Sequence, residues 1–181
     1  MCAHGAQPAS LPRKFFLAMI AAAVVFFCTE APGALSQAKL RNESYDAGLK
    51  ASRAGKYKQA AKLFQKAARE GVLDAFYMLG LLHQTGIGVA RSHRDALILY
   101  RHVALQGHPR AQAKMAQLIA DGKGTRADPV TGFMWYEVSV QLGNSSAISE
   151  RLKLAVRMKR SDIEQARRRA RECLKSKFRT C

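Results

Sequence analysis

Two stretches of this sequence decide its fold. Residues 75–107 read AFYMLGLLHQTGIGVARSHRDALILYRHVALQG, and residues 111–143 read AQAKMAQLIADGKGTRADPVTGFMWYEVSVQLG. The second stretch follows the first at an offset of 36 residues, and small residues, aromatics and glycines recur at matching positions. The matching sets are Ala75, Ala111 and Ala147; Gly86 and Gly122; Gly88 and Gly124; Ala60, Ala96 and Gly132; Phe64, Tyr100 and Tyr136; and Gly71, Gly107 and Gly143. Such recurrence predicts a structural repeat.

Each unit reads as two helices joined by a glycine loop. Apolar residues fall at helical spacing over 74–84, and Gly86 then breaks the pattern because glycine adopts backbone conformations that other residues avoid. Ser92 is placed to cap a second helix, and Gly107 is placed to end it. In the next unit, Asp128 is the expected N-cap of the second helix.

The outer units diverge from the two central ones. The first helix pair lacks the double-glycine loop and reads as a plain tetratricopeptide unit. The last pair carries an expected capping box at 161–164 and a very basic outer face, as suits a terminal pair that must stay soluble. The expected helix pairs are about 41–70, 74–107, 110–143 and 145–175, within one domain over 39–181.

The repeat pattern resembles the Sel1-like repeat, a relative of the tetratricopeptide repeat. The residues that carry the resemblance are Ala75, Leu79, Gly80, Gly86, Gly88, Val89, Asp95, Ala96, Tyr100 and Gly107. The segment 135–174 also resembles the C-terminal cap of exported bacterial Sel1-repeat proteins. Two positions depart from the pattern, since Ala116 replaces the glycine that matches Gly80 and Val140 replaces the alanine that matches Ala104. The resemblance implies an all-α fold, a right-handed α-solenoid that ends in a basic capping helix pair.

The N-terminal segment differs from the rest of the chain. Arg13 and Lys14 precede an unbroken apolar run over 15–27. Its thirteen residues suit the core of a signal peptide and fall short of the roughly 20 that a bilayer-spanning helix needs. Ser36 and Ala38 form a small-x-small cleavage site before Lys39, and Ala34 is a second candidate. We therefore expect 1–38 to be a signal peptide and the protein to be periplasmic or secreted; an uncleaved N-terminal anchor is the alternative.

Export would leave two of the four cysteines, Cys173 and Cys181. An even pair in an oxidising compartment favours a disulfide that closes a short C-terminal loop. A loop of this size contributes roughly 2.5 kcal/mol in a chain-entropy estimate. The alternative is two free thiols on a frayed tail.

Signals for catalysis or cofactors are weak in this sequence. The two Gly-x-Gly loops, at 86–88 and 122–124, lack the third glycine of a dinucleotide-binding loop and recur with the repeat, so they read as turns. The two C-terminal cysteines have no paired histidine, and the acidic residues occur singly. We expect no enzyme activity, no cofactor and no metal site.

Candidate partner-binding residues follow from the resemblance. Two first-helix positions of tetratricopeptide-like repeats face the concave groove, and Tyr45, Leu49, Tyr77 and Leu81 occupy them here. An apolar strip with polar neighbours suits an extended or helical peptide. The alternative is that some of these residues pack between repeats. In the same register, the further residues are Asn42, Asp74, Gln84, Arg110, Gln117, Ser149 and Lys153.

Positive charge is concentrated at the C-terminus. The formal net charge is +17, and residues 150–181 hold 12 basic and 4 acidic side chains. A basic patch of this kind favours an acidic protein, anionic lipid or an acidic polysaccharide. Nucleic acid would bind such a patch in vitro, but export argues against nucleic acid as the physiological ligand. The alternative is a simple solvated cap. The densest part of the patch is Arg167, Arg168, Arg169 and Arg171.

The family resemblance implies that the protein acts as an adaptor, which brings other proteins together. We expect a protein–protein interaction scaffold of the bacterial cell envelope that holds a partner segment on its concave face and regulates an envelope or signalling complex. The second hypothesis is an electrostatic binding module for anionic envelope material, acting through the basic C-terminus. The third is a β-lactam-related hydrolase, which the chain disfavours because the secreted relatives with that association carry a cysteine pair in each repeat.

Overall fold

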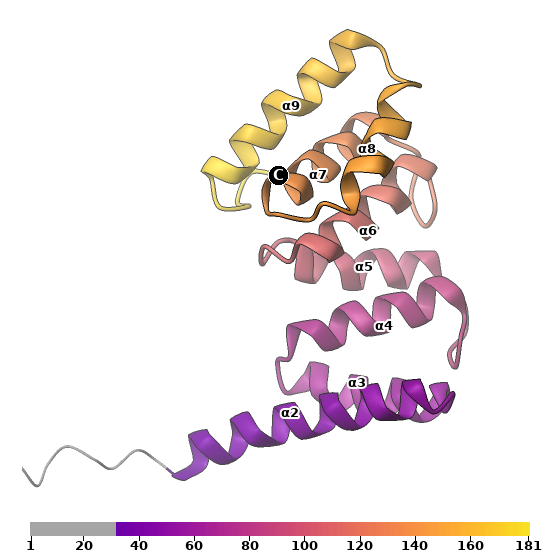
Figure 1. Cartoon of the computed structure of the whole chain (residues 1–181), viewed down its shortest axis with the longest axis vertical. Coiled ribbons are helices and arrows are strands. Elements are labelled where there is room, and N and C mark those ends of the chain that lie inside the picture. The colour runs from indigo at the N-terminus through magenta and orange to yellow at the C-terminus, as the bar shows by residue number, and fades with distance from the viewer. Residues whose placement is uncertain (1–31) are drawn as a thin grey trace, which may run out of the picture. The chain divides into compact units, whose positions relative to one another are not determined.

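The computed structural model describes residues 32–181, with side chains from Glu43 onward, and the secondary structure of that part is helical throughout (Figure 1). The expected all-α fold of successive helix pairs is confirmed, and residues 39–181 form one unit. The signal-peptide core at 15–27 lies outside the described residues. The helices are α2 (Pro32–Arg53), α3 (Tyr57–Arg69), α4 (Leu73–Thr85), α5 (His93–Ala104), α6 (Pro109–Asp121), α7 (Pro129–Gln141), α8 (Ala147–Ala155) and α9 (Arg160–Lys175). Of these eight described helices, none combines the length and apolar character needed to cross a bilayer.

Side-chain caps start the second helices of the central units where the sequence predicts them. Ser92 Oγ accepts a hydrogen bond from the Asp95 N–H at 3.1 Å, before α5. Asp128 Oδ1 accepts from the Thr131 N–H at 2.9 Å, before α7. Each cap satisfies a backbone donor that the first turn of a helix leaves without an intrahelical partner.

Within the first two units, an aromatic ring of the second helix packs against a glycine of the first. A Cβ atom added to Gly48 would lie 2.7 Å from Phe64 Cε1, and one added to Gly80 would lie 2.5 Å from Tyr100 Cε1. Carbon atoms at optimal contact are about 3.5–4.0 Å apart, so only glycine lets the two helices approach this closely. Phe64 and Tyr100 are fully buried as a result.

In the third unit, the glycine that allows close approach of the two helices lies on the second helix instead of the first. Ala116 stands where Gly80 stands in the unit before, and it is fully buried. The glycine lies instead on α7, where a Cβ added to Gly132 would lie 2.7 Å from Ala120 Cβ on α6. The departure of Ala116 from the repeat pattern is therefore accommodated by a close approach at another point of the same helix pair.

The double-glycine loops dock each unit on the one before it. A Cβ added to Gly88 would lie 2.5 Å from the backbone carbon of Tyr57, at the start of α3. The same atom on Gly124 would lie 2.6 Å from the backbone carbon of His93, at the start of α5. Both glycines also have positive φ, which other residues rarely adopt. The loop glycines thus serve the stacking of units.

The last helix pair departs from the repeat. Helix α9 packs mainly on α7 rather than on its expected partner α8, and the buried residues of α9 include Ala166, Ala170 and Cys173. Small residues four and three apart form a flat stripe that allows close packing. The expected capping box is wrong, because α9 already begins at Arg160 and places Ser161 inside the helix.

Candidate functional site

Aromatic and cationic side chains form a cluster on the exposed face made by the first helix of each pair. Tyr77 on α4 is half-buried, and its ring centroid lies 5.1 Å from that of His108 and 5.9 Å from that of Tyr100. The guanidinium carbon of Arg110, on α6, lies 5.4 Å from the centroid of the Tyr77 ring. This arrangement is a cation–π contact between consecutive units.

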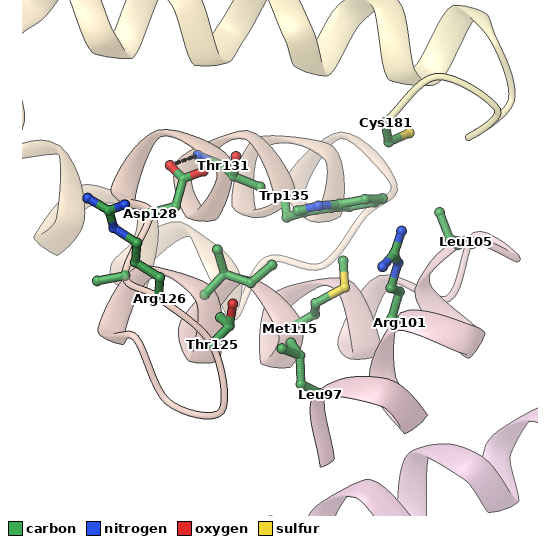
Figure 2. A pocket seen from close by; sticks show the side chains of 12 residues that line it. Leu97, Arg101, Leu105, Met115, Thr125, Arg126, Asp128, Thr131, Trp135 and Cys181 are labelled. Atoms are coloured by element: carbon green, nitrogen blue, oxygen red, sulfur yellow. Dashed lines mark hydrogen bonds between the residues drawn. The ribbon is translucent and has the colours of Figure 1, made fainter. Parts of the chain in front are cut away.

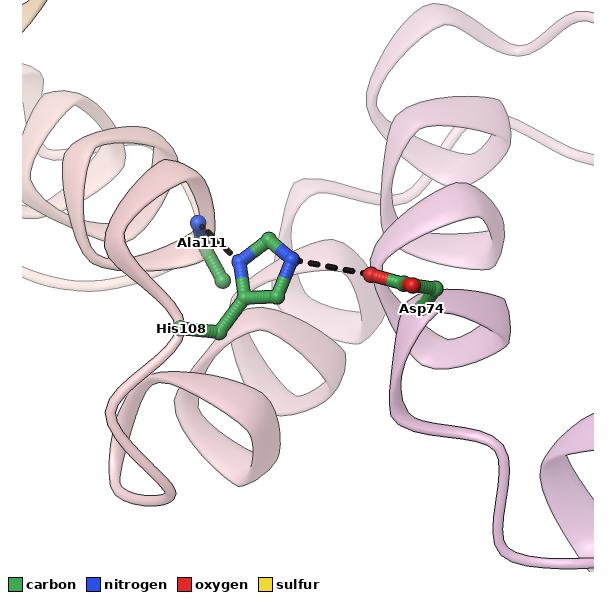
Figure 3. A network of polar contacts seen from close by, with 3 residues as sticks. All are labelled: Asp74, His108 and Ala111. Carbon is green, nitrogen blue, oxygen red and sulfur yellow. Dashed lines mark hydrogen bonds and ion pairs between the residues drawn. The ribbon is translucent and has the colours of Figure 1, made fainter.

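His108 holds this cluster in place (Figure 3). Its Nδ1 accepts a hydrogen bond from the Ala111 N–H at 3.0 Å and so caps α6. Its Nε2 lies 3.1 Å from Asp74 Oδ1 on α4. Because Nδ1 is an acceptor, the neutral ring carries its hydrogen on Nε2 and donates it to the carboxylate. One side chain therefore ties the start of α6 to the start of α4, beside Tyr77.

Tyr45 belongs to the same face. Its ring centroid on α2 lies 5.7 Å from that of the buried Phe64. Burial raises the pKa of Tyr45, the negative charge of Asp74 raises it further, and the positive charge of Arg110 opposes both effects. Burial also raises the pKa of Tyr77, again opposed by Arg110. Both hydroxyls therefore stay neutral near pH 7 and are available as hydrogen-bond donors.

Two adjoining surface pockets extend this face toward the C-terminus. One has a volume of about 160 Å³ and includes Tyr77, Arg110 and Gln117 in its lining. The other has a volume of about 220 Å³ and includes Gln117 and Lys153. The two pockets share Gln117, Tyr136 and Glu150. The structure thus brings together four residues that the sequence assigned to the partner site: Tyr77, Arg110, Gln117 and Lys153.

Of the other predicted residues, Leu49, Leu81 and Gln84, like Tyr45, lie outside these pockets. Leu49 and Leu81 are half-buried and pack against the hydrophobic core. Gln84 Oε1 accepts a hydrogen bond of 2.8 Å from the Tyr100 hydroxyl, whose pKa burial raises well above its ordinary value. Leu49, Leu81 and Gln84 therefore make contacts within and between units, which was the alternative considered from the sequence.

Sequence reasoning did not single out several pocket residues. Lys114 follows Arg110 by four positions and precedes Gln117 by three, so all three share one face of α6. Because this spacing is visible in the sequence, Lys114 could have been predicted to join Arg110 and Gln117 at the site. Glu150 and Arg157 on the C-terminal side belong to no repeat pattern, and only the fold brings them to the pockets. We call Tyr45, Tyr77, Arg110, Lys114, Gln117 and Lys153 the first-helix face.

The predicted basic patch is divided by the packing of α9. Arg167, Arg168 and Arg171 are exposed. Arg169 turns toward α7 and donates a hydrogen bond of 3.1 Å to Thr131 Oγ1.

The two C-terminal cysteines lie at the other end of α9. The structure joins Cys173 to Cys181 by a disulfide, with a Cα–Cα distance of 4.9 Å. Among residues 43–181, no group of three or more His, Cys, Asp or Glu side chains is arranged to hold a metal ion.

Stacked helix pairs with an exposed first-helix face define a helical-repeat protein, a class whose extended surfaces serve for binding. A family model described as Sel1 repeat matches residues 44–72, 74–108 and 109–144, and the chain belongs to the Sel1 repeat family. The match includes the first helix pair, which the sequence suggested was a plain tetratricopeptide unit. Proteins of this family generally mediate protein–protein interactions. A search of curated proteins finds no match to the chain.

Two solved structures show the same fold. A protective antigen of uropathogenic Escherichia coli that displays an SLR fold superposes with a TM-score of 0.70 at 22% identity, over 76% of this chain and 31% of that one. A Sel1 repeat protein from Oxalobacter formigenes superposes with a TM-score of 0.56 at 20% identity, over 67% of this chain and 98% of that one. This chain therefore matches less than a third of the length of the E. coli protein.

Proposed function

We propose that this protein is an adaptor of the bacterial cell envelope that holds a segment of a partner protein on its first-helix face. The observation that carries the proposal is the Tyr77–Arg110 contact beside two adjoining pockets. Tyrosine and arginine are enriched among the residues that dominate binding energy in protein interfaces. The pockets carry both signs of charge, since their lining includes Lys114, Lys153 and Glu150, so the partner segment would need a complementary mixed pattern.

Charge reversal at Arg110 tests this proposal. Arg110 is exposed and its cation–π contact with Tyr77 contributes about 0.5–1 kcal/mol at such a site, so Arg110→Glu should change the free energy of unfolding by no more than about 1 kcal/mol. Loss of a central interface residue can cost about 2 kcal/mol or more of binding, which is roughly thirtyfold in affinity. The measurement is retention of partners from envelope extract at low and high salt. The matched control is Lys62→Glu, which makes the same charge change at an exposed site on α3.

A partner retained by the wild type and Lys62→Glu but lost by Arg110→Glu supports the first-helix face. Equal retention by all three proteins contradicts it. Tyr77 is a poorer test than Arg110, because its ring packs on Tyr100 and His108. Truncation to alanine would mix loss of stability with loss of binding.

A second candidate function rests on the exposed arginines of α9. Arg167, Arg168 and Arg171 form a basic surface that suits anionic lipid or acidic polysaccharide of the envelope. Binding of this kind is strongly weakened by salt. Retention that disappears at high salt, and that reversal of the three arginines to glutamate abolishes, would favour this function over the adaptor.

The proposal includes export of the protein from the cytoplasm. The apolar run at 15–27, followed by the small residues Ser36 and Ala38, supports a cleaved signal peptide and a periplasmic or secreted protein.

A further inference from the structure

A third cavity, larger than the two pockets of the first-helix face and with a volume of about 680 Å³, lies among α5, α6 and α7 (Figure 2). Each helix contributes residues four apart, which share one helix face. Helix α5 contributes Leu97 and Arg101, with Leu105 directly after its end; α6 contributes Met115 and Ile119, and α7 contributes Thr131 and Trp135. The volume falls within the range of about 300–1,000 Å³ that is typical of ligand sites.

The cavity faces away from the first-helix face. Met115 and Ile119 lie two residues before and two residues after Gln117 on α6. Since successive residues of an α-helix are about 100° apart, two positions correspond to a rotation of about 200°. A ligand in this cavity would therefore not compete with one on the first-helix face.

The lining of the cavity is apolar in the middle and cationic at the ends. Trp135 and Met115 are only 4% and 1% exposed and form its interior. In Figure 2, Arg126 lies at one end and Arg101 at the other, with Trp135 and Met115 between them. Within the described part of the chain, neither arginine has a carboxylate within ion-pair distance. Both are exposed and available to a ligand.

Asp128, the acidic side chain in the lining, is engaged by the protein itself. It caps α7 through the Thr131 N–H. Burial alone would raise the pKa of Asp128, but hydrogen bonds from Thr131 and the nearby charge of Arg169 outweigh burial and hold it below its ordinary value. The lining side chains therefore set two guanidinium groups against one ionised carboxylate, and that carboxylate is already engaged within the protein.

The C-terminal loop supplies one wall. Cys181 is part of the lining, and its disulfide to Cys173 holds it beside α7. Phe178 in the same loop packs over Gly107, where an added Cβ would lie 3.1 Å from Phe178 Cε2. A cross-linked segment thus forms one wall of the cavity.

We propose that this cavity binds a short segment of a partner protein in which an apolar side chain is flanked by two carboxylates. The apolar side chain packs on Trp135 and Met115, and each carboxylate accepts hydrogen bonds from one arginine. Arginine matches a carboxylate with two parallel hydrogen bonds, which gives both energy and orientation. The protein would then join two partners, one on each side of α6. This inference is independent of the function proposed for the first-helix face.

A displayed library of random 12-residue peptides, selected on the purified protein, tests the proposal. The selection should enrich an apolar residue between two acidic ones. Trp135 is the chain's single tryptophan, so synthetic peptides from the selection should change its fluorescence on titration. The variant R101E/R126E should bind them roughly tenfold or more weakly. The matched control R167E/R168E makes the same charge change on α9 and should bind as the wild type does.

Three results would overturn the proposal. The first is a selection that enriches no acidic pattern. The second is equal weakening in R101E/R126E and R167E/R168E, which would indicate general attraction to a basic protein. The third is a response of Trp135 fluorescence to dodecanoate but to no selected peptide, which would make the cavity a small-molecule site. Arg110→Glu should leave these titrations unchanged, so failure here is distinguishable from failure of the first-helix face.

Discussion

Gly80→Ala should destabilise the protein, although alanine normally stabilises a helix. Gly80 lies inside α4 and is buried against α5. Alanine is favoured over glycine by about 1 kcal/mol in a helix interior. The added methyl, however, would lie 2.5, 2.7 and 3.0 Å from three ring carbons of Tyr100. These separations are about 1 Å shorter than ordinary carbon contacts.

The Tyr100 ring has little freedom to move away. It is fully buried, its hydroxyl is hydrogen-bonded to Gln84, and Tyr77 packs against it. Overpacking of a well-packed core costs about 1–3 kcal/mol, and this site belongs in the upper half of that range. After subtraction of the gain in helix propensity, we expect a net loss of about 1–2 kcal/mol. For a domain of this length, that loss lowers Tm by about 3–8 °C.

Thermal unfolding followed by circular dichroism measures this effect, and a double-mutant cycle assigns its cause. Tyr100→Leu by itself should destabilise, because it removes ring contacts and the hydrogen bond to Gln84. In that background the ring is absent, so Gly80→Ala should be neutral or stabilising. A higher Tm for Gly80→Ala alone, or an equal loss in both backgrounds, would refute the packing argument.

Three further predictions concern the ends of the chain and one helix cap. Mass spectrometry of native protein should find an N-terminus between Leu35 and Lys39, and an intact first methionine on cytosolic material would contradict export. Non-reducing peptide mapping should recover Cys173 linked to Cys181, whereas full alkylation of both without reductant would contradict the bridge. Because the pKa of Asp128 is lowered on folding, its contribution is present above the unfolded-state value near 4 and is lost as pH falls through the lower folded-state value. Urea unfolding from pH 7 to 2 should therefore show wild type losing stability relative to Asp128→Asn in the acid range, and parallel curves would argue against the charged cap.

The sequence by itself determined the repeat and most of its local structure. The 36-residue offset, the loop glycines and the caps at Ser92 and Asp128 are encoded within a few residues of where they act. Local backbone preferences and side-chain caps depend on neighbours in sequence, so they can be read without a fold. The same holds for the shared α6 face of Arg110 and Gln117.

Tertiary structure alone decided which surfaces stay open. Leu49 and Leu81 occupy one groove position of the repeat and Tyr77 occupies the other. All three pack against the core, and of the three Tyr77 also lines a pocket. Helix α9 packs on α7 instead of α8, which turns Arg169 inward. The cavity around Trp135 unites three helices and the C-terminal loop. These outcomes depend on contacts between residues that are distant in sequence, where small differences in side-chain volume decide how closely helices approach.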